Sequence, residues 1–488
     1  MKKLTTFLLL TLFALTMQAQ RVIDNLDRGV VAVKTTGGVF VSWRIQSDEY
    51  YDVTYNLYRD GSLIAENLKV SNFNDASGST SSKYTVAAVV NGVVQEHSQS
   101  VAVWAQDYME ITPQHPSELK ATYVPNDACA ADVDGDGEVE LLMKYNNSQE
   151  MSNSFPVNGW YNEHTLFEVT KLDGSVLWWV NCGPNMGDFQ NNEQNIVGYD
   201  WDQDGSAEVL MRLEEGSSIH MSDGSVYTIG ADGNNGTSWT NYRSQGWVSA
   251  AGATVAVETG VSSTATVSCP VDWVTVSKVN GVVYATASQN GNPTVNGSGR
   301  STTITIVDNG VTKKLGFGQN YYRNGTEVSS QYFTHYGKEF LVYCNGKTGQ
   351  VYDIIDFPCA RFESGETDLN AAWGDGYGHR SSKFFYGAPY LDGRNPSIFV
   401  GRGIYTRHKF VALDVDKNTH KLSERWRWMN NQAGSPWYGQ GYHNYGIADV
   451  DWDGRDEIVF GGLVIDDNGM GLSTRSEERR VGKECRSR

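Results

Sequence analysis

The chain has 488 residues, which is more than one ordinary globular domain needs, so several domains are expected. A formal net charge of −18 disfavours nucleic acid and anionic membranes as partners, because like charges repel. The 14 Trp, 26 Tyr and 51 Gly beside only 11 Pro are typical of an all-β protein with carbohydrate contacts, although Trp and Tyr also fill β-sheet cores.

Residues 1–19 are predicted to form a secretion signal. Lys2 and Lys3 supply the positive start, residues 8–15 the apolar run, and cleavage is expected after Ala19. The apolar run is too short to cross a bilayer. We therefore expect a secreted or periplasmic, monomeric protein without membrane insertion.

Residues 20–104 are predicted to form a small β-sandwich. Short strand-like runs alternate with tight turns, and the pattern resembles a fibronectin type III module. The runs lie at residues 39–43, 55–58 and 84–90, and the turns at Asp60-Gly61 and Asn91-Gly92. We expect this module to pack against the next domain rather than to carry chemistry.

An acidic pattern, Asp-x-Asp-x-Asp-Gly-x-x-Glu, occurs at residues 132–140, 200–208 and 449–457. Carboxylates at positions one, three, five and nine converge if the chain wraps around a point, and the glycine permits the sharp turn. Hard oxygen ligands suit Ca²⁺, whereas the alternative is a solvated acidic hairpin turn. The expected ligands are Asp132, Asp134, Asp136, Glu140, Asp200, Asp202, Asp204, Glu208, Asp449, Asp451, Asp453 and Glu457.

Each acidic loop leads into an apolar run that reads as a strand, whereas an EF-hand would lead into a helix. Residues 105–245 and 320–474 alternate short strands with Asp-Gly and Asn-Gly turns. Regular strands with recurrent calcium loops predict a β-propeller.

Residues 246–319 interrupt this rhythm with Ser/Thr/Asn-rich turns and no acidic loop. Three segments, at 271–277, 298–306 and 311–319, resemble the BACON module, so we expect a small β-sandwich inserted into a propeller loop. Such modules are proposed to bind carbohydrate, but Trp273 is equally expected in the core of the sandwich.

With these motifs, the chain resembles polysaccharide lyase family 11, the rhamnogalacturonan lyases, over residues 22–472 outside the insertion. The similarity is densest in glycine-rich blocks at residues 373–380, 401–407 and 439–444, and in residues 448–472. The resemblance implies an eight-bladed, calcium-bound propeller behind an N-terminal sandwich. It also implies cleavage of rhamnogalacturonan I, the rhamnose–galacturonate backbone of pectin, by β-elimination.

In that reaction a base removes the C5 proton of a galacturonate, and the rhamnose leaves at O4. The C5 proton becomes acidic when Ca²⁺ or an arginine neutralises the adjacent carboxylate. Arg380, Arg402 and Arg407 are the expected carboxylate partners, since guanidinium groups suit that geometry. His443 is a candidate proton acceptor or calcium-site neighbour. Structural Arg–Asp pairs and a turn-capping histidine are the alternatives.

For substrate binding, Asn126 and Asn146 are similar to a sugar-contacting pair of the family, and Lys144 is a weaker candidate. Three departures raise an alternative function. The second asparagine stands where the family usually has Asp, residues 191–196 replace a His-Tyr-containing stretch, and Arg212 replaces Lys. The alternative is a non-catalytic pectin- or glycan-binding protein on a lyase scaffold. An integrin-like adhesion propeller is disfavoured, because calcium binding alone does not require the residue-specific glycine-rich blocks.

Residues 475–488 resemble a translated sequencing adaptor, and the alternative is a natural basic tail. On the adaptor interpretation the chain is truncated before further cleft residues, and this leaves open whether the catalytic base belongs to the present or to the missing residues. The truncated chain is then expected to be unstable or inactive, because an unclosed propeller exposes a sheet edge.

Overall fold

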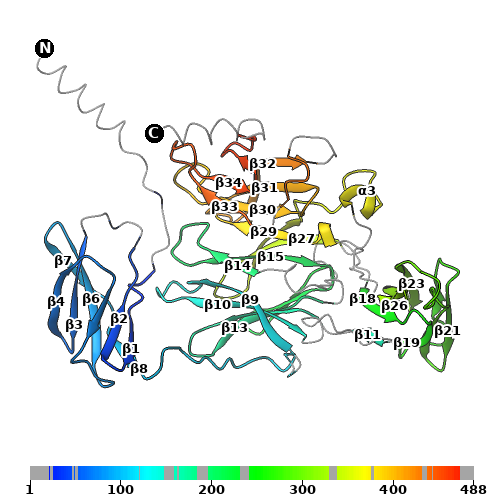
Figure 1. Ribbon diagram of the computed structural model, residues 1–488, viewed down its shortest axis with the longest axis horizontal. Coiled ribbons are helices and arrows are strands. Elements are labelled where there is room, and N and C mark those ends of the chain that lie inside the picture. Colours follow the sequence, from blue (N-terminus) through cyan, green and yellow to red (C-terminus); the bar gives the residue numbers. More distant parts are fainter. Residues whose placement is uncertain are drawn as a thin grey trace, which may run out of the picture.

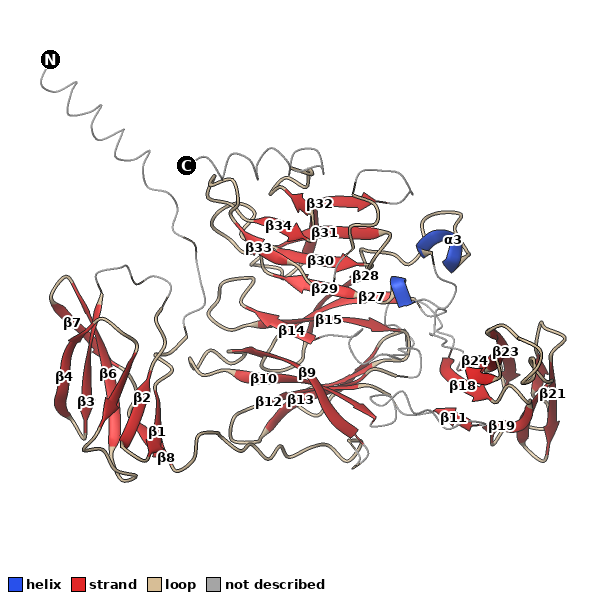
Figure 2. Cartoon of the chain, viewed as in Figure 1, coloured by secondary structure: helices blue, strands red, loops and turns tan. Residues whose placement is uncertain are grey.

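The computed structural model describes residues 21, 26–46, 49, 53–119, 121, 123–147, 159–161, 164–183, 196–230, 241–328, 338–374, 379–430, 437–441 and 443–472. Over these residues the chain is nearly all β, as expected (Figure 2). The described helices are α3 (Leu369–Trp373) and the 3₁₀ turn η1 (His379–Ser381). Neither is long and apolar enough to cross a membrane. The expected signal at 1–19 and the tail at 475–488 fall outside the described residues.

The N-terminal unit is one eight-stranded sheet that folds over its own core, with strand order β4-β3-β6-β8-β1-β2-β5 and with β7 paired to β6. Both predicted hairpin turns are present, and Asp60, Gly61, Asn91 and Gly92 all have positive φ. The strands are β1 (Val31–Thr35), β2 (Gly38–Ser42), β3 (Thr54–Arg59), β4 (Ser62–Leu68), β5 (Asn72–Asp75), β6 (Lys83–Val90), β7 (Val93–His97) and β8 (Val101–Trp104).

Four further sheets lie one above another in the middle of the molecule (Figure 1). The first contains β9 (Tyr123–Ala131), β10 (Glu140–Asn147), β12 (Leu166–Thr170), β13 (Val176–Asn181), β16 (Ser218–His220) and β17 (Val226–Thr228). The second contains β14 (Ile196–Tyr199), β15 (Glu208–Glu214), β27 (Glu339–Cys344) and β28 (Val351–Asp356). The third contains β29 (Phe384–Gly387), β30 (Ile398–Arg402), β31 (His408–Val415) and β32 (Leu422–Asn430). The fourth contains β33 (Gly446–Ala448), β34 (Glu457–Phe460) and β35 (Leu463–Ile465).

Each sheet packs face to face on the next, and one apolar cluster fills each of the three interfaces. The period-two geometry of a strand allows this, because successive side chains point to opposite faces. On β15, Val209 and Met211 face the first sheet, whereas Leu210 faces the third. On β31, Val411 faces the second sheet, whereas Phe410 faces the fourth. The central strands therefore read as continuous apolar runs.

A separate unit with its own core lies on the side of the stack away from the N-terminal unit (Figure 1). Trp273 packs against this core, and the Arg300 guanidinium lies 4.5 Å from the centre of its ring, so this tryptophan serves packing. The strands are β11 (Gly159–Tyr161), β18 (Asn241–Val248), β19 (Ala253–Thr259), β20 (Thr266–Ser268), β21 (Val274–Val279), β22 (Val282–Ala287), β23 (Arg300–Asp308), β24 (Val311–Gln319), β25 (Tyr321–Arg323) and β26 (Thr326–Val328).

The strand directions separate two ends of the stack. The acidic loops immediately precede β10, β15 and β34, and they lie along one end, where Ala207 N–H donates to Asp132 O at 2.6 Å. The other end carries Asn146, Glu214 and Arg402. A strand of seven or eight residues places the two ends about 20 Å apart. A cation in the loop before β10 or before β15, which have eight and seven residues, therefore cannot touch a carboxylate bound at the far end.

Candidate functional site

The three acidic loops share one backbone fold. In each, the carboxylate of the first aspartate accepts the N–H of the sixth residue, a glycine, at 2.8 Å for Gly137, 3.1 Å for Gly205 and 3.0 Å for Gly454. These glycines have φ of 89°, 97° and 93°, the left-handed region that the tight turn requires. The pattern in the sequence therefore predicts the wrap of the chain correctly.

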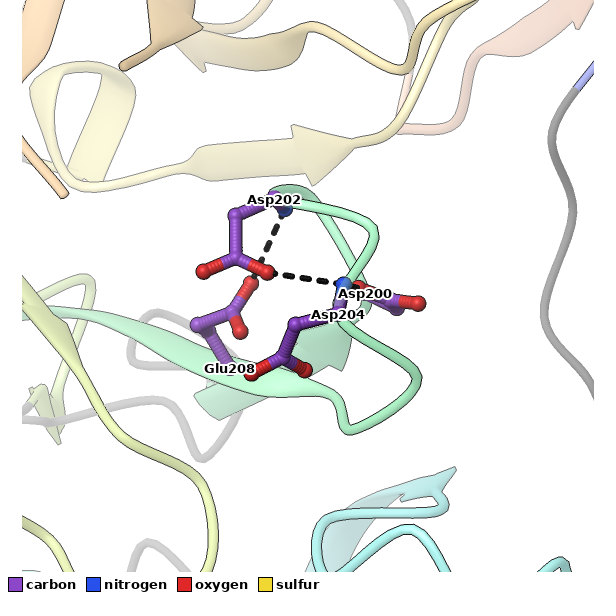
Figure 3. A group of neighbouring side chains, drawn as sticks. All are labelled: Asp200, Asp202, Asp204 and Glu208. Atoms are coloured by element: carbon purple, nitrogen blue, oxygen red, sulfur yellow. Dashed lines mark hydrogen bonds between the residues drawn. The ribbon is translucent and has the colours of Figure 1, made fainter. Parts of the chain in front are cut away.

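In the second loop, all four expected carboxylates converge (Figure 3). Oxygen atoms of Asp200, Asp202, Asp204 and Glu208 lie within 4.8 Å of one another, as a hard cation requires. Burial, and then the charges of Asp202 and Asp200, raise the pKa of Glu208 to about 9. The His420 Nδ1 atom lies 2.9 Å from Asp202 Oδ2 and is the nearest basic group described.

The third loop gains a carboxylate that the pattern does not contain. Asp466, in the turn after β35, forms an acidic group with Asp451 and Glu457. Glu457 is completely buried, and its Oε1 atom has no hydrogen-bond partner in the described part of the chain. Burial first, and then the charge of Asp451, raises the pKa of Glu457 to about 7. A buried carboxylate oxygen without a partner among other carboxylates is what a bound cation would satisfy.

The first loop is different, because a lysine lies inside it. Lys171 Nζ is 2.7 Å from Asp134 Oδ2, 3.1 Å from Asp136 Oδ2 and 3.6 Å from Glu140 Oε1. The acidic group here contains Asp132, Asp134 and Asp136 without Glu140. The second and third loops therefore fit a divalent cation with oxygen ligands, whereas an ammonium group already fills the first.

At the opposite end of the stack, Arg402 is not available as a carboxylate partner for a substrate, contrary to the sequence prediction. The side chain is completely buried, and Nη1 donates to Glu339 Oε2 at 2.7 Å and to the Cys359 carbonyl at 3.1 Å. Arg212 and Arg361 bind the other Glu339 oxygen at 2.8 and 2.9 Å. These arginines hold the pKa of Glu339 far below its usual value even though burial alone would raise it. Arg402 therefore serves a structural ion cluster.

Arg407 is also buried and paired. Its two terminal nitrogens donate to both oxygens of Glu366 at 2.7 Å, and this pairing lowers the pKa of Glu366 to about 2. Beside it, Lys409 Nζ contacts Glu363 Oε1 at 2.5 Å. Both acids belong to the segment before α3 and are partly exposed, so they lie between these cations and solvent.

Arg380 and His443 meet around a residue that the sequence reasoning missed, Tyr405. The Arg380 guanidinium lies 5.9 Å from the centre of the Tyr405 ring, and Tyr405 Oη is 2.6 Å from His443 Nε2. Tyr405 is 41% exposed with φ of 65°, a strained conformation for an aromatic residue. A tyrosine inside the glycine-rich block at 401–407 was the available signal. His443 does not belong to any of the acidic groups found among the described residues, and its proximity to a calcium site stays a prediction.

Asn126 and Asn146 lie together, on β9 and β10. Asn126 Nδ2 donates to Asn146 Oδ1 at 3.0 Å, and Asn146 Nδ2 donates to Thr165 Oγ1 at 3.1 Å. Lys144, two residues before Asn146, is completely buried and lines a cavity of about 210 Å³ with Cys129. This group lies on the first sheet, whereas Arg380 lies in η1, which precedes the third sheet. Residues 191–195, where a departure was noted, lie outside the described part of the chain.

His408 provides a pH prediction. It is completely buried, neither ring nitrogen has a hydrogen-bond partner among the residues that the structure describes, and burial lowers its pKa to about 4. A depressed pKa favours folding above the unfolded value of 6.5, and this contribution is lost as the pH falls from 6.5 towards 4. We expect the wild type to lose about 2 kcal/mol more stability between pH 7 and pH 5 than His408→Gln. Urea unfolding at both pH values measures this, with the exposed His97→Gln as control. Equal losses in wild type and His408→Gln would contradict it.

Two family models match the chain. The model described as "Rhamnogalacturonan lyase family 11, C-terminal domain" matches residues 109–265 and 295–480, and "Rhamnogalacturonan I lyases beta-sheet domain" matches residues 21–104. The first model leaves a gap within the separate unit that contains β19–β24. Together the two matches cover most of the chain.

Two Bacillus subtilis proteins are similar in sequence. Rhamnogalacturonan endolyase YesW is 32% identical over 464 residues, with 93% of this chain and 57% of YesW covered. Rhamnogalacturonan exolyase YesX is 30% identical over 466 residues, with 93% and 58% covered. The chain therefore spans less than two thirds of the length of these relatives.

Solved structures agree with the sequence matches. The crystal structure of the exotype lyase YesX superposes with a TM-score of 0.62 at 28% identity, covering 93% of this chain and 59% of YesX. A Bacillus licheniformis rhamnogalacturonan lyase gives 0.60 at 27% identity, covering 94% and 61%. The family models, the relatives and the fold all confirm the resemblance, and the chain belongs to rhamnogalacturonan lyase family 11.

Proposed function

We propose that this protein is a calcium-binding lyase that cleaves rhamnogalacturonan by β-elimination. The observation that carries the proposal is the cluster of Arg380, Tyr405 and His443, which joins a cation, a hydroxyl and an imidazole at one exposed place. Its relatives YesW and YesX are named as rhamnogalacturonan lyases, which supplies the substrate class. The stacked sheets support a propeller of the eight-bladed type, and the N-terminal unit supports a fibronectin III-like sandwich.

In the proposed reaction, Arg380 pairs with the carboxylate of a galacturonate and stabilises the negative charge that develops when the C5 proton leaves. His443 accepts that proton, the C4–C5 double bond forms, and the C4–O4 bond breaks. Tyr405 donates its hydroxyl proton to the departing O4. The 2.6 Å contact between Tyr405 Oη and His443 Nε2 then lets the proton return from the imidazole to the phenolate.

Calcium is proposed to occupy the second and third acidic loops. Asp200, Asp202, Asp204 and Glu208 would hold one ion, and Asp449, Asp451, Asp453, Glu457 and Asp466 would supply the ligands of another. Since the second loop lies at the far end of the seven-residue strand β15, about 20 Å from the end that carries the proposed reaction site, its ion would brace the strands rather than touch the substrate. A secreted or periplasmic location is also proposed, from the signal expected at residues 1–19.

The proposal is tested by following the ultraviolet absorbance of unsaturated uronate products from rhamnogalacturonan I. We expect the signal to rise with rhamnogalacturonan and not with homogalacturonan. Binding of the polymer without any absorbance change would instead identify a glycan-binding protein.

His443→Gln is expected to lower kcat about 100-fold or more while KM changes little. The reason is that the imidazole takes part in the transition state of proton transfer and does not contribute to substrate binding in the ground state. Product absorbance over a range of substrate concentrations separates the two constants. His97→Gln, in the N-terminal unit, should keep wild-type rates. A variant of His443 with unchanged kcat would exclude it as the proton acceptor.

A further inference from the structure

The three acidic loops have the same sequence pattern but different surroundings, and the difference lies in Lys171. We propose that the Lys171 ammonium takes the place of a divalent cation in the first loop, which is therefore closed without metal. The proposal rests on the calcium binding proposed above for the other two loops. On this proposal, the first of the three acidic loops keeps its fold without calcium, although its sequence has the calcium-binding pattern.

Lys171 is held in position by a tight turn between β12 and β13. Its N–H donates to Ser175 O at 2.9 Å, and Gly174 N–H donates back to Lys171 O at 2.9 Å. The turn is fixed to the preceding segment, because Gln114 N–H donates to Gly174 O at 2.7 Å. The ammonium therefore projects from a rigid element toward the loop, with the side chain only 24% exposed.

The carboxylates of the first loop are arranged around this ammonium. Lys171 reaches Asp134, Asp136 and Glu140, the third, fifth and ninth positions of the pattern. Both oxygens of Asp132, the first position, accept backbone N–H groups at 2.8 Å from Gly135 and Gly137. Each of the four positions thus has at least one partner from the chain itself, and the oxygen left over is the buried Asp134 Oδ1, which has no hydrogen-bond partner among the described residues.

Among the residues that the structure describes, no lysine or arginine forms an ion pair with the expected ligands of the other two loops. In the second loop, His420 contacts Asp202 and no other carboxylate of the loop among the ion pairs described. In the third loop, no ion pair among the described residues reaches Asp449, Asp451 or Glu457, and the buried Glu457 Oε1 has no partner. Among the described residues, a lysine that reaches three carboxylates of one loop is therefore specific to the first loop.

The first loop also supports the N-terminal unit. Asp27 N–H donates to Gly137 O at 2.9 Å, and a Cβ atom at Gly137 would lie 3.1 Å from Asp27 Cβ, so the two backbones are in close contact. Because Lys171 closes this loop, the joint between the N-terminal unit and the first sheet persists at low calcium. The second and third loops, which brace the sheets farther along the stack, respond to calcium instead.

Calcium binding to the full chain, counted by isothermal titration calorimetry, tests the proposal. Lys171→Met is expected to bind one more ion than the wild type, because removal of the ammonium leaves carboxylates that only a cation can neutralise. Lys171→Arg, which keeps the charge, should match the wild type. Equal counts in wild type and a folded Lys171→Met would overturn the proposal.

A second pair of variants keeps the proposal testable if Lys171→Met does not fold. Asp134→Asn, in the first loop, is expected to leave the count unchanged, and Asp451→Asn, in the third, to lower it by one ion. An ion lost in both variants would overturn the proposal but leave the calcium function intact. A wild type that binds no calcium would contradict that function instead, and an ion gained by Lys171→Met would still support the role of Lys171.

Discussion

Removing calcium is expected to lower the free energy of unfolding of the stacked sheets by about 3 kcal/mol per ion. This value compares the metal-free protein with the protein at a free calcium concentration about 100 times the Kd. Glu208 and Glu457 are buried among other carboxylates, and this environment raises their pKa values to about 9 and about 7. Without a cation these groups repel each other at neutral pH or must take up protons.

The effect has a definite pH dependence. A carboxyl whose folded pKa is raised stabilises the metal-free fold below the unfolded value of 4.5, and this stabilisation is lost as the pH rises through the folded pKa. Calcium should therefore stabilise the chain more at pH 8 than at pH 5. Urea unfolding followed by tryptophan fluorescence, with calcium or with chelator, measures the difference. Asp416→Asn, an exposed turn residue outside the loops, should respond as the wild type does, and equal midpoints with and without calcium at pH 8 would count against bound ions.

Glu339→Gln is expected to destabilise the chain by about 3–5 kcal/mol, because it leaves buried arginines without their shared carboxylate. Glu339 binds Arg212, Arg361 and Arg402 at 2.7 to 2.9 Å. Glu214, the other acid of the cluster, is completely buried and cannot neutralise three guanidinium groups alone.

Chemical denaturation of the two forms measures this loss. The matched control is Glu424→Gln, which breaks the exposed pair with Arg427 and should cost less than about 1 kcal/mol. If the two substitutions cost the same, the cluster around Glu339 does not hold the second and third sheets together.

The acidic loops show what a sequence can predict when all determinants lie within nine residues. The spacing of the carboxylates and the glycine at the sixth position require one local wrap, and all three loops adopt it. The short strands and the turns at Asp60-Gly61 and Asn91-Gly92 were also predictable, because neighbouring residues determine them.

The determinants that were missed come from distant parts of the chain. Lys171 enters the first loop from a hairpin more than 30 positions away, and Asp466 joins the third loop from the following hairpin. Arg402 lies in a glycine-rich block that suggests a binding site, but its partner Glu339 is 63 positions earlier. Local patterns carry no information on such pairings, so they cannot distinguish a buried structural arginine from an exposed one.

The most direct test of the reaction is to digest rhamnogalacturonan in water labelled with the heavy oxygen isotope and to determine the masses of the products by mass spectrometry. Elimination breaks the bond without adding water, so we predict products that absorb in the ultraviolet and carry no label from the cleavage step. Products that carry one heavy oxygen at the cleaved bond and do not absorb would show hydrolysis and contradict the lyase function.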